Sequence, residues 1–246
     1  MKDNNIETLP KVSVITVVRN DKDHIEATIK SLFNQDYPNI EYIVIDGAST
    51  DGTFELLSQY SDKIDILISE PDDGIYDAMN KGIRICSGDY IGILNSGDEY
   101  ADIHAISSVF LGNVEGADVI YGDSIEVSDD IEKVIKVGSF NLMEYGPIYR
   151  HGSSFVKASV HKKYVFDLNR HDLGYALDWE QIYRLYKLDY AFKYSGSTIE
   201  KYRKDGISNN GYKNAWYNFL ITAAYNKKIL KFLYFLKAFL ATTIFK

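Results

Sequence analysis

The chain has 246 residues, enough for one large α/β domain or for a domain with an appendage. Hydrophobic residues make up 46% of it and aromatic residues 14%, which excludes a chain too polar to fold, and its single cysteine excludes an intramolecular disulfide framework. The net charge is −8, but segment 213–246 holds six of the 27 basic residues and no acidic residue, so 21 basic residues oppose all 35 acidic ones elsewhere. This acidic body argues against nucleic acid as a partner.

The first hundred residues alternate between apolar runs and amphipathic segments. Continuous apolar, β-branched runs are typical of strands buried on both faces of a parallel sheet. Apolar residues that recur every three or four positions between these runs predict helices. Three successive strand–helix–strand units imply right-handed crossovers and a Rossmann-like nucleotide-binding layer. The predicted strands are 12–18, 40–46, 64–69 and 90–94, and the predicted helices are 22–35, 51–60 and 74–86.

The second half of the chain is less regular. Its clearest element is a helix at 176–188, in which Leu177, Ile182 and Leu185 recur at helical spacing. No internal repeat or low-complexity linker interrupts the chain, so we expect one catalytic domain with a helical tail. Strands are predicted at 117–123, 124–127, 133–138 and 153–157, and YAFKYSG and STIEKYR are predicted to form a pair of strands.

Polar residues follow each predicted strand at the point where the strand ends, and ligands bind beyond this edge in open α/β sheets. Any one of these groups alone is typical of a turn. Their convergence favours a site, because unpaired carboxylates in one cleft repel one another unless a cation or a ligand shares the space. The strand ends are followed by Arg19-Asn20-Asp21, Asp46-Gly47-Ala48-Ser49, Glu70-Pro71-Asp72-Asp73, Asn95-Ser96-Gly97-Asp98 and Gly122-Asp123.

The usual phosphate-binding sequences are absent, since neither G-x-G-x-x-G after the first strand nor G-x-x-x-x-G-K-[ST] occurs. A bound diphosphate would then need another counter-charge, and a divalent cation at the end of the fourth strand would supply it. Asp98 is the candidate ligand, because it is anionic whereas Asn95 and Ser96 offer only neutral contacts.

Four segments together resemble the family 2 glycosyltransferases of GT-A fold: VSVITVVRND, VIDGASTDGT, EPDDGIYDAMNKGI and GDYIGILNSGDEY. The resemblance implies an α/β fold with a mostly parallel central sheet and helices on both faces, and the composition of the last segment adds an amphipathic helical tail. It implies inverting transfer of a sugar from a nucleotide diphosphate donor, expected to be UDP-linked, to a hydroxyl, with Mn²⁺ or Mg²⁺ as the cofactor. The glycosyltransferase domain would span 1–211, with a nucleotide-binding half (11–125) and an acceptor half (126–211), before the tail (212–246).

The resemblance also assigns donor-binding roles. Asp98 matches the family's metal ligand, although Asn95 and Gly97 stand where the family often has acids. Asp46 matches the acid that accepts a hydrogen bond from the pyrimidine ring, which favours uracil or thymine over cytosine. Arg203 is placed at the diphosphate because guanidinium binds phosphate in a bidentate manner. For Lys81 a solvated helix face is an equal alternative. The implied donor-binding residues are Val18, Arg19, Asp46, Asp77, Asn80, Lys81, Asn95, Ser96 and Arg203.

Inverting transfer needs a base that takes the acceptor proton. Asp178 matches the family's acidic pair and is the expected base, with Glu180 second, although both are also ordinary acids for the start of a helix. The adjacent Trp179 favours catalysis at Asp178, because an exposed helix start does not call for a tryptophan. His151 matches a family histidine expected near the acceptor, although a lone histidine is more often structural.

The end of the chain, KKILKFLYFLKAFLATTIF (227–245), combines aromatic residues with lysines. It is shorter and more charged than the roughly 20 apolar residues of a transmembrane span. An interfacial helix on an anionic membrane surface fits it, and a helix packed on the domain or on another subunit is the alternative. The amino-terminal MKDNNIETLPK has no signal-peptide character. We therefore expect a cytoplasmic protein that is peripheral at the inner face of the cell membrane. Its expected acceptor is a glycan or a lipid-linked molecule, and the sequence does not decide whether it forms an oligomer.

Two other functions remain open. A sugar nucleotidyltransferase would use the same type of fold, but VVRNDKDH lacks the glycine-rich, basic phosphate loop expected after its first strand. A non-catalytic sugar-nucleotide-binding partner in a glycan assembly complex is supported by the neutral residues of N-S-G-D.

Overall fold

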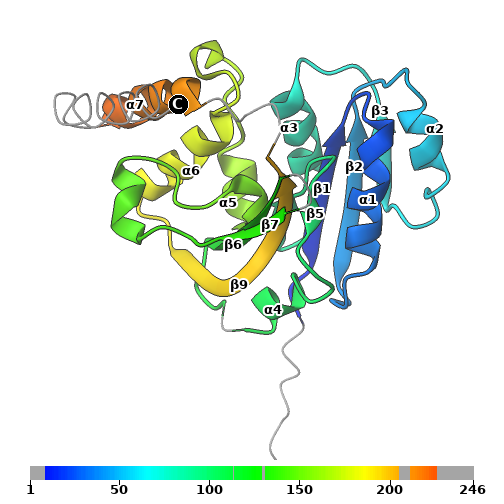
Figure 1. Ribbon diagram of the computed structural model, residues 1–246, viewed down its shortest axis with the longest axis horizontal. Coiled ribbons are helices and arrows are strands. Elements are labelled where there is room, and N and C mark those ends of the chain that lie inside the picture. Colours follow the sequence, from blue (N-terminus) through cyan, green and yellow to red (C-terminus); the bar gives the residue numbers. More distant parts are fainter. Residues whose placement is uncertain (1–8, 113, 129–130, 205–210, 226–246) are drawn as a thin grey trace, which may run out of the picture.

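A mixed sheet of nine strands runs through the molecule, as the computed structural model in Figure 1 shows for residues 9–112, 114–128, 131–204 and 211–225. The strand order is β3-β2-β1-β4-β8-β6-β9-β5, and β7 pairs with β6 outside this path. The predicted α/β class is therefore confirmed. Parallel pairing dominates in the first half of the chain and antiparallel pairing in the second.

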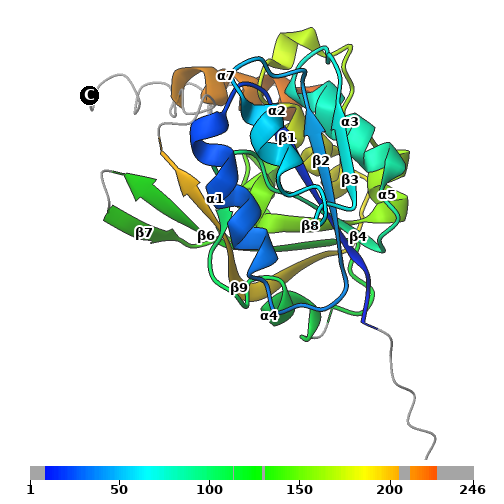
Figure 2. The ribbon, with the colours of Figure 1, turned by 90° about the vertical axis from the view of Figure 1, so that its right-hand side faces the viewer.

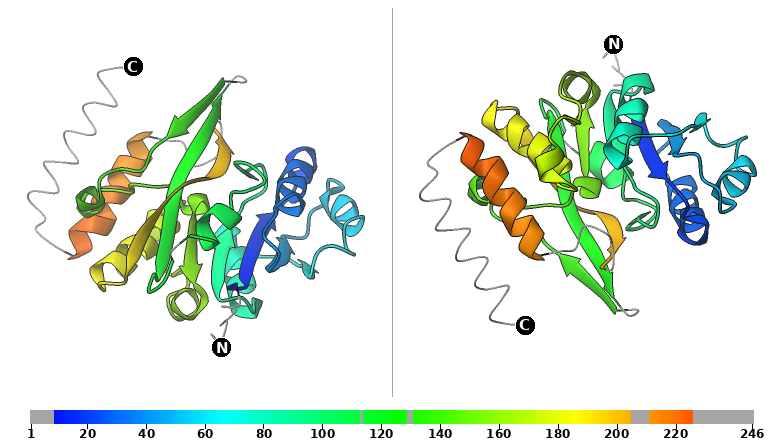
Figure 3. Two further views of the ribbon diagram at one scale, coloured as in Figure 1. Left: turned by 90° about the horizontal axis from the view of Figure 1, so that it is seen from below. Right: turned by 90° about the horizontal axis from the view of Figure 1, so that it is seen from above.

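The parallel half contains the seven elements that the sequence predicted, each within two residues at either end. Its helices lie on both faces of the sheet (Figures 1 and 3). The strands are β1 (Val12–Val18), β2 (Ile40–Asp46), β3 (Ile66–Ser69) and β4 (Tyr90–Ile93), and the helices are α1 (Lys22–Phe33), α2 (Thr53–Ser58) and α3 (Ile75–Ile85).

The central strand β1 is apolar along almost its whole length because both of its faces are buried. Ile15 and Val17 belong to the hydrophobic cluster that contains α3, whereas Val14 and Val18 belong to the cluster that contains α1. Side chains of a strand point alternately to its two faces, so a strand between two helical layers needs apolar residues at successive positions. This burial fixes the carboxyl end of β1 at the sheet edge where ligands bind.

The second half of the chain extends the sheet. Figure 2 shows the pair formed by β6 and β7 projecting from the body of the molecule. The segments predicted as separate strands at 117–123 and 124–127 are the single strand β6. The strands are β5 (Glu99–Tyr100), β6 (Val119–Ser128), β7 (Ile131–Ile135), β8 (Ser154–Lys157) and β9 (Phe192–Arg203).

The predicted pair of strands in YAFKYSGSTIEKYR is wrong, because β9 runs through it without a turn. Tyr194 pairs with Tyr121 of β6, and Thr198 pairs with Asp123, so the stretch of β9 between them is longer than its partner. Gly196 lies in this bulge with a φ of +78°. A β-bulge absorbs such extra residues inside a continuous strand, and glycine tolerates the positive φ.

The remaining helices come after β5 in the chain. Helix α6 (Leu177–Lys187) lies beside α7 (Gly211–Tyr225), with the rings of Tyr183 and Tyr225 5.5 Å apart (Figure 1). Within the described residues no helix has the length and apolarity of a membrane span, and the predicted interfacial segment 227–245 lies outside them. The short helices are α4 (Ser107–Phe110), α5 (Ala158–Lys163), η1 (Phe140–Glu144), η2 (His151–Ser153) and η3 (His171–Leu173).

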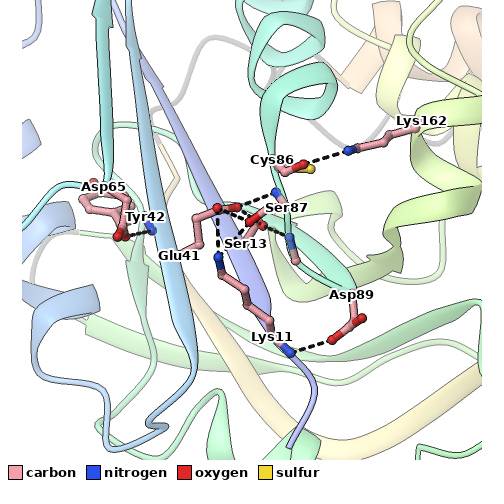
Figure 4. A network of polar contacts seen from close by, with 10 residues as sticks. Lys11, Ser13, Glu41, Tyr42, Asp65, Cys86, Ser87, Asp89 and Lys162 are labelled. Carbon is pink, nitrogen blue, oxygen red and sulfur yellow. Dashed lines mark hydrogen bonds and ion pairs between the residues drawn. The ribbon is translucent and has the colours of Figure 1, made fainter.

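A buried carboxylate ties three segments together at the amino-terminal end of β1 (Figure 4). Glu41 on β2 is 6% exposed and accepts hydrogen bonds from Ser13 Oγ and from the backbone and hydroxyl of Ser87. Lys11 Nζ donates a further bond to it at 3.1 Å. Burial alone would raise the pKa of Glu41, but these hydrogen bonds outweigh burial and lower it to about 2. This network stabilises the fold far from the ligand-binding edge.

Glu41→Gln is expected to lower the free energy of unfolding by about 2–3 kcal/mol at neutral pH, because an amide cannot accept the charge-assisted bonds. The pKa of Glu41 is about 2 in the folded protein, against 4.5 ordinarily. The stabilisation is therefore fully present above pH 4.5 and is lost as the pH falls toward about 2. Urea unfolding of both proteins from neutral to acidic pH measures this difference. If the difference in unfolding free energy between the two proteins did not become smaller at acidic pH, the stabilising role of the Glu41 carboxylate would be contradicted.

Candidate active site

A cavity of about 860 Å³ opens at the carboxyl ends of β1 and β4. Its walls come from both halves of the chain: the starts of α3 and α6, the segment 147–152, the end of β9 and one side of α7. A cavity at the carboxyl edge of the parallel strands is the position expected for a ligand in an open α/β sheet. The structure therefore assembles one site from segments that are far apart in the sequence.

The loop after β4 contributes all four residues of N-S-G-D to this cavity. Ser96 Oγ donates a hydrogen bond of 2.7 Å to Asp21 Oδ2, which fixes the loop against the end of β1. Gly97 has a φ of +89°, a conformation that a residue with a side chain adopts only under strain. Asn95 Oδ1 is buried and has no hydrogen-bond partner within the described residues. The loop therefore has a fixed conformation, and the Asn95 Oδ1 atom is a hydrogen-bond acceptor without a partner among the described residues.

Asp98 faces a second carboxylate. The pKa of Asp98 is raised to about 8, chiefly by burial and also by the negative charge of Glu200, while Arg150 opposes the rise. Glu200, on β9, is 1% exposed and accepts a hydrogen bond of 3.1 Å from Arg150 Nε. The Arg150 guanidinium in turn lies over the ring of Tyr202, 3.5 Å from its centre. No motif in the sequence pointed to Glu200, which lies within the strand β9.

These residues are suited to bind a divalent cation whose remaining coordination positions are filled by a bound ligand. Across the described ranges no cluster of three or more His, Cys, Asp and Glu side chains forms a complete protein-only metal site. Asp98, Glu200 and the unpartnered Asn95 oxygen offer the oxygen atoms that Mg²⁺ and Mn²⁺ prefer. Magnesium in particular is commonly held by one or two carboxylates together with phosphates of the substrate.

The two predicted candidates for the base have different environments. Asp178 lies at the start of α6, lines the cavity, and accepts a hydrogen bond of 3.2 Å from the Tyr76 hydroxyl of α3. Glu180 does not line the cavity; it is 5% exposed and lies 3.7 Å from Arg184 on its own helix. Residues two apart on a helix point in roughly opposite directions, which explains the separation. The geometry therefore favours Asp178.

His151 lines the cavity beside Arg150. Burial lowers the pKa of His151, with partial compensation from the negative charges of Asp178 and Glu200. Its ring packs edge-on against Phe166, with the centroids 5.7 Å apart. His151 is therefore a packed part of the cavity wall.

Five of the predicted donor-binding residues line the cavity: Val18, Arg19, Asn95, Ser96 and Arg203.

Three others, all on α3, do not line it. Asn80 exchanges two hydrogen bonds with the backbone of Phe166, and so joins α3 to the second half of the chain. Lys81 pairs with Glu70 at 2.9 Å and with Asp77 at 3.5 Å. These contacts hold the loop between β3 and α3 in place.

Asp46 also lies behind the cavity wall. It is fully buried, and its Oδ2 accepts hydrogen bonds from Ser49 N and Ser69 Oγ, while Oδ1 has no partner in the part of the chain that the structure describes. Asp72, by contrast, lines the cavity. Its carboxylate lies against Gly47, in the space that a side chain at position 47 would occupy. The sequence showed Asp72 only as one of several acids after β3.

Comparisons with known proteins agree with this geometry. The model of the family described as Glycosyl transferase family 2 matches residues 13–158. An uncharacterised glycosyltransferase of Mycobacterium tuberculosis is 35% identical over 182 residues, which cover 71% of this chain and 68% of the relative. TuaG of Bacillus subtilis, named as a glycosyltransferase of teichuronic acid biosynthesis, is 38% identical over 94 residues, 37% of each chain.

Two solved structures are similar over most of the chain. TarS 1-349 of S. aureus in complex with UDP-GlcNAc has a TM-score of 0.69 at 16% identity, covering 94% of this chain and 73% of its own. The mannosyltransferase PcManGT of Pyrobaculum calidifontis, in complex with GDP-Man and Mn²⁺, has a TM-score of 0.69 at 18% identity, covering 94% and 69%. At these identities the likeness establishes a shared fold.

Proposed function

The chain belongs to glycosyl transferase family 2, and from that membership we propose that it moves a sugar from a nucleoside diphosphate donor to an acceptor hydroxyl with inversion. It has the predicted GT-A fold and is a transferase. Membership of the family also decides against a sugar nucleotidyltransferase. The observation that carries the proposal is that one cavity contains both Asp98, from the first half of the chain, and Asp178, from the second.

The proposed reaction is a displacement at the anomeric carbon. Asp178 takes the proton of the acceptor hydroxyl, the oxygen forms a bond to the anomeric carbon, and the bond from that carbon to the diphosphate oxygen breaks. Tyr76 holds Asp178 through its hydrogen bond. Asp98, Glu200 and Asn95 would hold Mn²⁺ or Mg²⁺, and the cation would supply positive charge to the leaving diphosphate. Arg203 and Arg150, which also line the cavity, add positive charge near that group.

We propose Asp72 as the carboxylate that reads the base, in place of Asp46. A carboxylate there accepts from the ring N–H of uracil or of guanine, but meets a lone pair on cytosine. The donor is therefore proposed to be UDP-linked, with GDP-linked donors compatible with the same contact. Asp46 would support this edge from behind through Ser49 and Ser69.

Asp72→Asn is expected to weaken UDP binding about tenfold and to remove the preference for UDP over CDP, because the amide no longer offers only acceptors. Calorimetric titration with UDP, GDP and CDP in the presence of Mn²⁺ measures both effects. Asp46→Asn is the matched control: it should lower thermal stability but keep the preference. If the preference for UDP over CDP disappeared in Asp46→Asn and persisted in Asp72→Asn, the contact with the nucleotide base would have to be assigned to Asp46.

A screen of nucleotide sugars for thermal stabilisation, with and without Mn²⁺, tests the proposed function as a whole. A ligand that binds only the folded state raises the melting temperature in proportion to the logarithm of its concentration over Kd. A metal-dependent shift with one donor, followed by its slow hydrolysis, supports the transferase. Binding without turnover, even with an authentic acceptor, would instead support a non-catalytic sugar-nucleotide-binding partner.

We propose a glycan or lipid-linked acceptor at a membrane surface, on the composition of segment 227–245. Its four lysines and its aromatic residues suit an anionic interface. A chain that stops at residue 225 is expected to lose binding to vesicles with anionic lipid while it retains UDP binding, and sedimentation with neutral and anionic vesicles measures this. Equal sedimentation of the full and shortened chains would contradict the proposal.

A further inference from the structure

Two buried side chains in the wall of the cavity each keep a hydrogen-bond donor without an acceptor. Tyr149 is 8% exposed and Trp179 is 4% exposed. Neither Tyr149 Oη nor Trp179 Nε1 has a hydrogen-bond partner among the residues that the structure describes. A buried donor left without an acceptor costs about 1–3 kcal/mol, and native proteins contain few of them. Two such donors in one cavity therefore call for an explanation.

Both residues line the same cavity as the proposed base. Trp179 follows Asp178 directly on α6, and both line the cavity. Tyr149 comes from the segment that precedes β8; burial raises the pKa of its hydroxyl well above the usual value, and the charge of Asp178 adds to this rise. The Tyr149 hydroxyl therefore keeps its proton and remains a donor.

Packing fixes both rings. Tyr149 stacks on Tyr121 of β6 with a centroid distance of 4.6 Å and an angle of 19° between the planes. Trp179 packs against Tyr183 at 5.4 Å. This packing holds both rings in the cavity wall, where their donors have no partner among the described residues.

The chemistry around Asp178 matches a saccharide. Asp178 can accept a hydrogen bond, whereas Tyr149 and Trp179 can donate, and a pyranose presents hydroxyls that do both. Tyr76, Tyr149 and Trp179 together make the wall aromatic around this point, as in many binding sites that combine apolar surface with a few polar groups.

We propose that Tyr149 and Trp179 form a saccharide subsite, in which Tyr149 Oη and Trp179 Nε1 donate hydrogen bonds to hydroxyl oxygens of the pyranose that lies against Asp178. The inference rests on the proposed function and adds the residues that recognise the sugar. The pyranose belongs either to the donor or to the acceptor, and the two sources are separated by the experiment.

The test uses Tyr149→Phe and Trp179→Phe in the full chain. Each removes one donor, and Tyr149→Phe keeps the ring that packs on Tyr121. The matched controls are Tyr183→Phe, whose hydroxyl bonds to Glu144, and Trp216→Phe on α7; neither control residue lines the cavity. Without ligand, Tyr149→Phe should be at least as heat-stable as the wild type, because it loses an unsatisfied group, whereas Tyr183→Phe should be less stable.

Calorimetry with UDP, UDP-GlcNAc, UDP-glucose and GDP-mannose, with Mn²⁺ present, tests the donor as the source. If the pyranose is that of the donor, the affinity for UDP stays within about twofold, and the extra affinity of the nucleotide sugar falls about fivefold to tenfold. Saturation-transfer NMR with octyl β-glucoside and octyl β-N-acetylglucosaminide, in the presence of UDP and Mn²⁺, tests the acceptor. A loss of that signal with unchanged donor affinity supports the acceptor pyranose.

Wild-type behaviour of Tyr149→Phe in every titration would overturn the inference, since the donors would then bind only water. A wild-type protein that bound no nucleotide would instead refute the proposed function itself, a distinct result.

Discussion

Asp178→Asn is expected to lower the rate of sugar transfer about 10²–10⁴-fold, the range that a positioned general base contributes. The amide keeps the size of the side chain and can still meet the Tyr76 hydroxyl, so the cavity should keep its shape. Affinity for the nucleotide should therefore stay within about twofold. Rates at saturating donor, together with calorimetric titration of UDP, separate the lost chemical step from lost binding.

Glu180→Gln is the matched control for this result. Glu180 lies on the same helix, but it packs near Arg184 and does not line the cavity. Its amide should therefore leave the transfer rate close to that of the wild type, with a modest loss of thermal stability. An active Asp178→Asn protein together with an inactive Glu180→Gln protein would move the base to Glu180. If both were active, neither residue would be the base.

Asp98→Asn is expected to lower transfer about 10²–10³-fold, because the charge on the leaving diphosphate would lose its principal counterpart. The same change should abolish the tight binding of Mn²⁺ in the presence of UDP, since an amide oxygen is a much weaker ligand for a hard cation than a carboxylate. Electron paramagnetic resonance of Mn²⁺ measures this binding without any turnover. Binding of UDP alone should change little.

Glu99→Gln offers the control for Asp98. Glu99 is the next acid along the chain and begins β5, but it does not line the cavity. It should keep Mn²⁺ binding and activity. If Asp98→Asn bound Mn²⁺ with UDP as the wild type does, the cation site would have to be assigned to other residues, with Glu200 as the first to test.

The parallel half of the fold was readable from the sequence because its signals are local. β1 and β2 are buried on both faces, so most of their positions carry apolar residues, and the helices between the strands show their own periodicity. The prediction of two strands at β9 is wrong, because it places a turn at Gly196. Gly196 lies in a β-bulge inside one strand. A turn and a bulge both accept a glycine with positive φ, so only the pairing with β6 distinguishes them.

The sequence by itself predicted Asp98 and Asp178 as residues of one site, Asp98 from its place after the fourth strand and Asp178 from the family resemblance, and both line the cavity. It could not determine which neighbouring acids share the cavity. Asp46 ends β2 and Asp72 follows β3, yet Asp46 is fully buried, with one oxygen bonded by Ser49 and Ser69, while Asp72 lines the cavity.

Only the tertiary structure brought Glu200 to Asp98 and left Tyr149 and Trp179 without acceptors. The physical reason is that exposure and hydrogen-bond satisfaction depend on residues far away in the chain: Glu200 stands about a hundred residues from Asp98. Periodicity gives the face on which a side chain lies, but not the partner that it meets there. The lack of a hydrogen-bond acceptor for Tyr149 and Trp179 can therefore be recognised only from the packed structure.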